Sequence, residues 1–180
     1  GSPLMSVSEL RNLIDTGAEG EQEKSPHGDQ TIIFDCRFQL GQPDWGQQAF
    51  LDSHIPGARF LDLDKDLSSA VIPGETGRHP LPQPEALATT LATKGVNTTT
   101  RIIVYDDGPG FYAARAWWLL RWLGHESVYV LNGGMAAWVA DGGETESGTE
   151  QEHQPGNFQP TLHAGMTVNA KEVMASLAAH

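Results

Sequence analysis

The sequence predicts a doubly wound α/β domain, in which helices cover both faces of a central parallel sheet of about five strands. Short apolar segments rich in β-branched residues alternate along the chain with segments whose apolar residues recur at helical spacing. The predicted strands are apolar throughout, as strands buried on both faces require. In folds of this class, ligands bind at the carboxyl ends of the strands. We therefore expect a functional site in the turns that follow the strands.

The first predicted helix follows a short N-terminal segment. We interpret residues 1–5 as a remnant of a cloning vector without a role in the fold. Ser6 and Glu9 have the spacing of a capping box, and apolar residues then recur at helical intervals until Gly17 ends the run. The next segment, 18–30, is polar and is expected to form a surface loop.

The remaining elements follow from runs of apolar residues and from the Gly and Pro residues that separate them. Strands are expected at 31–34, 59–63, 101–105 and 127–131. Helices are expected at 47–51, 84–95 and 112–123, and in a short segment that holds Met135 and Trp138. Residues 67–83 are rich in Pro and Gly, have no periodicity, and are expected to form a long excursion.

The composition excludes several classes of protein. The chain has 11 Lys and Arg against 23 Asp and Glu, and this net charge of −12 argues against binding to nucleic acid or to anionic lipid. The single cysteine, Cys36, excludes internal disulfides and multi-thiolate metal sites. The seven histidines lie apart from one another, so we predict no metal site. Asn132-Gly133-Gly134 lacks the third glycine and the following acid of a dinucleotide-binding motif, and no Lys-Ser/Thr pair follows Gly108-Pro109-Gly110, so we predict no cofactor. No apolar run approaches the length of about 20 residues that a membrane span needs, and we expect a soluble, cytoplasmic protein.

The composition changes near Asp141, where Gly, Glu, Thr, Gln and Pro replace apolar residues. We expect a linker at 143–165, followed by one more amphipathic helix at 166–180. No strand follows on which this stray C-terminal helix could pack, and we interpret it as the first helix of a truncated second domain. The alternative is a C-terminal helix that folds back on the first domain.

Four motifs of the chain together resemble those of a known family. They are Phe34-Asp35-Cys36-Arg37, then His54-Ile55-Pro56-Gly57-Ala58, then Ile103-Val104-Tyr105-Asp106 before a Gly-rich loop, and finally Val130-Leu131-Asn132-Gly133-Gly134 with Trp138. Residues 6–142 therefore resemble a rhodanese-like domain. Arg115-Ala116-Trp117-Trp118 and the long insertion around Pro73 to Pro84 resemble, more narrowly, the amino-terminal half of tandem-domain thiosulfate and 3-mercaptopyruvate sulfurtransferases.

The resemblance implies a chemistry for which this chain lacks the nucleophile. The family forms a cysteine persulfide in the loop after the strand that corresponds to 101–105, and passes the outer sulfur to a thiophilic acceptor. Here that position holds Asp106, and a carboxylate cannot carry a sulfane sulfur. Asp107 adds a second charge that repels an anionic sulfur donor, and Pro109 removes an N–H donor. We predict an inactive pseudo-active-site loop whose acids cap the following helix. The loop consists of Asp106, Asp107, Gly108, Pro109, Gly110 and Phe111.

The other motif residues are expected to be structural. Cys36 is expected to be a buried, inert thiol rather than a substitute nucleophile. Asp35 and Arg37 resemble structural residues of the family, and His54 is expected to hydrogen-bond its own turn. The resemblance gives the same structural role to Pro56, Gly57, Gly133, Gly134 and Trp138.

Two functions remain open from the sequence alone. In the first, the chain is the non-catalytic amino-terminal domain of a two-domain sulfurtransferase, with a second rhodanese domain as its partner. In the second, it is a stand-alone inactive rhodanese module that binds a basic partner through Asp106 and Asp107. In the first case Arg115, Trp118 and Trp122 are candidates for an interdomain face, and a fragment that exposes them is expected to self-associate.

Overall fold

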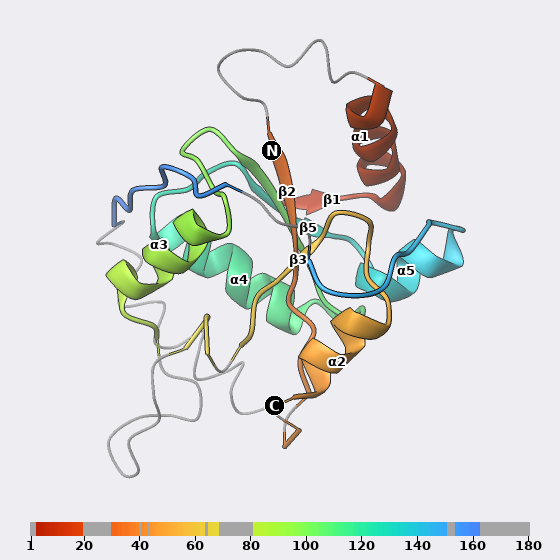
Figure 1. Cartoon of the computed structure of the whole chain (residues 1–180), viewed down its shortest axis with the longest axis horizontal. Helices are drawn as coiled ribbons and strands as arrows, with labels where there is room; N and C mark the ends of the chain where they lie inside the picture. Colours follow the sequence, from red (N-terminus) through yellow and green to blue (C-terminus); the bar gives the residue numbers. More distant parts are fainter. Residues whose placement is uncertain are drawn as a thin grey trace.

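A computed structural model describes residues 3–19, 30–39, 41–42, 44–63, 65–68, 81–150 and 154–162. These residues form a five-stranded sheet between two layers of helices (Figure 1), which confirms the predicted fold class. The strand order is β1-β5-β4-β2-β3, and every neighbouring pair is parallel. The strands are β1 (Leu4–Met5), β2 (Thr31–Asp35), β3 (Arg59–Phe60), β4 (Arg101–Tyr105) and β5 (Val128–Leu131).

The helices divide between the two faces of the sheet. They are α1 (Val7–Glu19), α2 (Trp45–Asp52), α3 (Pro84–Thr93), α4 (Phe111–Trp122) and α5 (Gly134–Ala140). Helices α3 and α4 lie on one side of the sheet, and α1, α2 and α5 on the other (Figure 1). Because successive side chains of a strand point to opposite faces, Ile102 and Val104 join the apolar cluster under α3 and α4, whereas Ile103 and Tyr105 join the opposite cluster.

The N-terminal segment has a role in the fold that our interpretation of residues 1–5 did not include. Leu4 pairs with Val130 and Met5 with Leu131, so β1 is an edge strand of the sheet. Met5 is buried. The capping box is confirmed, because the backbone N–H of Glu9 donates to Ser6 Oγ at 3.1 Å. The origin of residues 1–5 stays a prediction, but two of them belong to the sheet.

The segment expected to be a linker packs along the domain instead. We call its described residues, 143–150 and 154–162, the strap. The strap runs from α5 past β3 towards α3 (Figure 1). The backbone N–H of Phe158 donates to the oxygen of Val96 at 3.0 Å, and that of Thr161 to the oxygen of Leu123 at 2.7 Å. Phe158 itself is buried. These residues therefore pack more closely than their polar composition predicts, and their role as a linker between two domains stays a prediction.

Other expectations differ from the structure in smaller ways. The predicted strand 59–63 is a strand only at Arg59–Phe60, because the chain turns at Asp62, whose oxygen accepts the N–H groups of Asp66 and Leu67. The predicted helix 166–180 and most of the excursion 67–83 lie outside the described residues.

Candidate functional site: the loop after β4

The loop between β4 and α4 is organised around the side chain of Asp106. Its Oδ1 accepts the backbone N–H groups of Gly108 and Gly110, at 2.9 and 3.1 Å. Its Oδ2 accepts those of Tyr112 and Ala113, both at 3.1 Å. Asp106 is only 2% exposed. The chain thus folds four N–H donors around a carboxylate of its own, and two of those donors belong to the first turn of α4, as the capping prediction required.

The start of α5 holds this loop in place. The oxygen of Asp106 accepts the N–H of Met135 at 2.8 Å, and the oxygen of Asp107 accepts that of Ala136 at 3.0 Å. A side chain at Gly134 would place its Cβ 2.4 Å from the oxygen of Asp106. Gly133, with φ of 82°, adopts a conformation that favours glycine. The two glycines after β5 therefore serve the packing of the Asp106 loop, consistent with their predicted structural role.

Asp107 differs from its neighbour, because its side chain is exposed and does not cap the helix. Partial burial raises the pKa of the Asp107 carboxyl, the positive charge of Arg37 opposes this change, and the negative charges of Asp106 and Asp35 add to it. Ionised Asp107 is therefore less well stabilised than a carboxylate in open water.

A small pocket of about 140 Å³ opens beside this loop. The rings of Phe38 and Tyr112 meet edge to face in it, with centroids 5.4 Å apart. Phe111 also lines the pocket, and 52% of this residue is exposed. Sequence reasoning identified the loop but missed Phe38 and Tyr112, which tertiary packing brings together. The pocket is lined by Phe38, Asp106, Asp107, Pro109, Phe111 and Tyr112.

A buried ion pair lies at the end of the neighbouring strand β2. Arg37 Nη2 is 2.7 Å from Asp35 Oδ2, and Arg37 Nε also donates to this carboxylate. Arg37 Nη2 further donates to the oxygens of Ala49 and Ser53. Burial alone would lower the pKa of Arg37, but the hydrogen bonds and the charge of Asp35 outweigh burial and raise it. Both charges are satisfied within the fold, as expected of structural residues.

Tyr105 extends this network across the sheet. Its hydroxyl donates to Asp35 Oδ2 at 2.9 Å and accepts the N–H of Ile55 at 3.3 Å. Burial and the negative charge of Asp35 raise the pKa of Tyr105 well above its ordinary value, so the residue remains a neutral donor. The network fixes the ends of β2 and β4 relative to each other, and these are the two strands that precede the candidate site.

Comparison with known proteins decides the family of this arrangement. Residues 7–141 match the family model of the rhodanese-like domain. The chain belongs to the rhodanese-like domain family. This confirms the resemblance drawn from the four motifs.

Relatives of this rhodanese domain are named as sulfurtransferases. The chain is 47% identical over 147 residues to the "Probable 3-mercaptopyruvate sulfurtransferase" of Pseudomonas aeruginosa, a match that covers 81% of this chain and 51% of that protein. It is 40% identical over 150 residues to the 3-mercaptopyruvate sulfurtransferase of Escherichia coli K12, with coverage of 82% and 51%. The crystal structure of SseA from Escherichia coli, a 3-mercaptopyruvate sulfotransferase, superposes with a TM-score of 0.71 at 35% identity, covering 91% of this chain and 56% of that chain. The rhodanese chain thus spans about half the length of these relatives.

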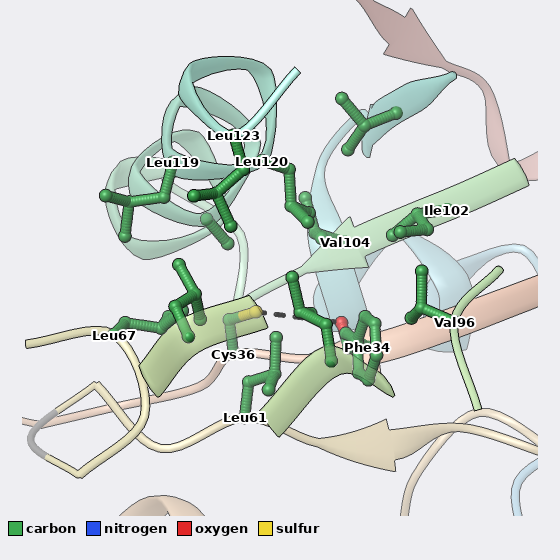
Figure 2. Packing of buried hydrophobic residues seen from close by; sticks show 14 of the residues in the cluster. Phe34, Cys36, Leu61, Leu67, Val96, Ile102, Val104, Leu119, Leu120 and Leu123 are labelled. Carbon is green, nitrogen blue, oxygen red and sulfur yellow. Dashed lines mark hydrogen bonds between the residues drawn. The ribbon is translucent and has the colours of Figure 1, made fainter. Parts of the chain in front are cut away.

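The only cysteine of this rhodanese domain lies in its apolar core. Cys36 is 1% exposed, and its sulfur points among apolar side chains such as Leu61 and Leu67 (Figure 2). Its Sγ donates a weak hydrogen bond to the oxygen of Phe34 at 3.9 Å. Burial raises the pKa of the Cys36 thiol well above its ordinary value, and the charges of Asp35, Asp106 and Asp66 add to the effect. The expectation of a buried thiol is confirmed.

We expected His54 to hydrogen-bond within its own turn, but its ring contacts residues of α2 and of the strap instead. Its Nδ1 lies 2.7 Å from the oxygen of Phe50 in α2, and its Nε2 lies 3.2 Å from Glu146 Oε1 in the strap. The same Glu146 oxygen accepts the N–H of Gly57 at 2.8 Å. The turn that contains Pro56 is thus joined to the strap through Glu146, a residue the sequence pattern did not single out. Trp138 makes a second link, since its Nε1 donates to the oxygen of Glu144 at 2.6 Å.

The residues predicted for an interdomain face lie inside this domain. Arg115, Trp118 and Trp122 are 2%, 9% and 4% exposed. Arg115 donates to the oxygen of Leu67 at 3.0 Å, and burial lowers the pKa of Arg115 to about 10. An interdomain face would need these side chains at the surface, so the structure corrects that prediction.

Among the described residues, no group of three or more His, Cys, Asp and Glu side chains is arranged to hold a metal ion. In the same part of the chain, every helix is too short or too polar to cross a membrane.

Proposed function

We propose that this rhodanese domain is the non-catalytic amino-terminal domain of a sulfurtransferase. The parent enzyme would move sulfane sulfur from thiosulfate or 3-mercaptopyruvate to a thiophilic acceptor, through a cysteine persulfide formed in a second rhodanese domain. The names of the relatives support the reaction class, and the matched segment, which covers only 51% of each of these relatives, supports the second domain. A cytoplasmic location belongs to the same proposal, since a lone buried thiol suits a reducing compartment.

One observation carries the non-catalytic role. The four N–H donors of the loop after β4 already hold the Asp106 carboxylate. Such a cluster of donors at a helix N-terminus is the feature that stabilises a thiolate or binds an anion. Here Asp106 occupies all four N–H groups, so they are not free to bind an anion such as thiosulfate. The Asp106 carboxylate also cannot attack the sulfur of thiosulfate. Cys36 cannot take over, because its sulfur is buried in the apolar core under α3 and α4.

The proposal is tested by sulfur-transfer assays with thiosulfate or 3-mercaptopyruvate as donor and cyanide as acceptor. We expect no turnover above the buffer rate from the 180-residue chain, and turnover from a longer polypeptide that adds a second rhodanese domain. The control is Cys36→Ser, which is expected to change neither result. Turnover by the chain alone, abolished by Cys36→Ser, would show that the domain is catalytic and that the proposal is wrong.

A further inference from the structure

The first half of the strap is fastened to the turn that follows α2. The backbone N–H and oxygen of Glu146 pair with those of His54 in an antiparallel bridge, at 2.9 and 2.8 Å. The backbone N–H of Gly148 donates to the oxygen of Leu51 at 2.9 Å. The side chain of Glu146 adds two contacts, because its Oε1 accepts the N–H of Gly57 at 2.8 Å and lies 3.2 Å from His54 Nε2. One carboxylate of the strap therefore contacts both ends of the turn 54–57.

The two contacts of the His54 ring together require an additional proton. His54 is 1% exposed, and its ring stacks on that of Phe50 with centroids 3.9 Å apart. Its Nδ1 lies 2.7 Å from the oxygen of Phe50, which only accepts, so Nδ1 carries a proton. In a neutral ring Nε2 is then an acceptor, and it faces a carboxylate that is also an acceptor. The contact at 3.2 Å is a hydrogen bond only when one more proton lies between His54 Nε2 and Glu146 Oε1.

The other charged groups near this turn do not bond the ring. The Tyr105 hydroxyl and the Arg37 guanidinium bond the backbone of the two residues on either side of His54. Asp35 binds both of them. The one carboxylate of α2, at its last residue, is exposed. Among the described residues, the charged partner of the ring is therefore Glu146.

A second carboxylate attaches the strap without such a proton. Glu150 Oε1 lies 2.7 Å from Lys94 Nζ and accepts the N–H of Phe60 at 3.3 Å. Lysine and glutamate ordinarily keep their charges between about pH 6 and pH 9, whereas histidine does not. The attachments of the strap through Glu146 and through Glu150 therefore differ in their dependence on pH.

We infer that His54 and Glu146 form a proton-dependent latch, which holds the strap against the turn 54–57 in mildly acidic solution and loosens as the pH rises. Loss of the shared proton leaves the lone pair of Nε2 facing a carboxylate, and this repulsion displaces the Glu146 side chain from the N–H of Gly57. The attraction is thus present while the ring holds both protons and is lost when the ring loses one. The latch is independent of the proposed function, because it involves neither the loop after β4 nor sulfur chemistry.

The experiment follows amide hydrogen exchange in the ¹⁵N-labelled chain between about pH 6 and pH 9, with each rate corrected for the intrinsic rate at that pH. The N–H of Gly57 reports on the attachment through Glu146, and that of Phe60 on the attachment through Glu150. We expect the protection of Gly57 to fall roughly fivefold over this range, the upper value for a partly exposed ion pair, and that of Phe60 to change less than about twofold. Long-range ¹H–¹⁵N spectra show the protonation of His54 Nε2, which is expected to be lost over the same pH interval.

Two variants of the strap complete the test. Glu146→Gln keeps the shape of the side chain but removes its charge, and it is expected to reduce the fall at Gly57 to less than about twofold. Glu144→Gln removes an exposed carboxylate two residues earlier and is expected to leave the fall at Gly57 as in the wild-type chain. Both positions lie outside the apolar core, so both variants are expected to fold.

The latch is refuted if the protection of Gly57 and of Phe60 changes equally with pH, or if Glu146→Gln retains the full fall. It is also refuted if the fall occurs over an interval in which His54 Nε2 does not change its protonation. These outcomes leave the proposed function intact. Sulfur transfer by the chain would overturn the proposed function whether or not the latch opens.

Discussion

The ends of β2 and β4 lie side by side and hold two residues with opposite surroundings. Asp35 and Tyr105 are register partners, and Cys36 and Asp106 follow them directly. Cys36 has the sulfur but lies among apolar side chains, where ionisation is penalised. Asp106 has the N–H donors but no sulfur. The comparison shows that neighbouring strand ends of one sheet can treat an anion in opposite ways, penalising it at Cys36 and stabilising it at Asp106.

The largest effect on the free energy of unfolding is expected at the buried ion pair between Asp35 and Arg37, at the end of β2. Arg37→Met removes the cation from Asp35, which is fully buried, and leaves that carboxylate without its ion-pair partner. We expect a loss of about 4 kcal/mol in the free energy of unfolding, measured by urea denaturation. The matched control is Arg11→Met, which breaks an exposed ion pair with Asp141. It should cost less than about 1 kcal/mol. Similar losses in the two variants would refute a structural role for the buried pair.

The second largest effect on the free energy of unfolding is expected at Asp106, at the end of β4. Asp106→Asn replaces an oxygen that accepts two N–H groups with an NH₂ group that cannot accept them. We expect the free energy of unfolding to fall by about 3 kcal/mol, since buried donors lose a charged acceptor. Urea denaturation at neutral pH measures this loss. A change below about 0.5 kcal/mol, the size usual at surface sites, would show that the carboxylate does not hold the loop.

The smallest effect on the free energy of unfolding is expected for Asp107→Asn, and its sign is opposite to that for Asp106→Asn. Because the folded chain raises the pKa of Asp107, ionisation of this group favours the unfolded state. Its unfavourable contribution is absent below the unfolded pKa and grows as pH rises through the folded pKa. Asp107→Asn cannot ionise and should be slightly more stable at pH 7, by less than about 0.5 kcal/mol given its exposure. The difference should vanish in strong acid. A loss of stability at neutral pH would contradict this account of Asp107.

Much of the sheet could be predicted, because β2, β4 and β5 are apolar runs bounded by polar turns. The position of Asp106 at the end of β4 followed from the same pattern. β1 has only two residues, which is too short for any periodicity, and it owes its place to pairing with β5.

The strap and the pocket depend on contacts that no local pattern contains. The strap is attached largely by backbone hydrogen bonds and by carboxylates such as Glu146, so its polar composition resembles that of a free linker. The pocket exists because Phe38 and Tyr112 meet across the fold. The burial of Arg115 likewise involves a hydrogen bond to the oxygen of Leu67, a residue distant along the chain.

The contrast between the two strand ends is tested most directly by moving the thiol from one to the other. The wild-type chain and a Cys36→Ala/Asp106→Cys variant each contain one cysteine, and the ultraviolet absorbance of the thiolate gives the pKa of each. Circular dichroism confirms that both chains are folded. We predict a pKa for the thiol at position 106 below the ordinary value of about 8.5, because four N–H groups stabilise its anion. For Cys36 in the wild-type chain we predict a pKa above that value. A thiol at position 106 that titrates no lower than Cys36 would contradict the account.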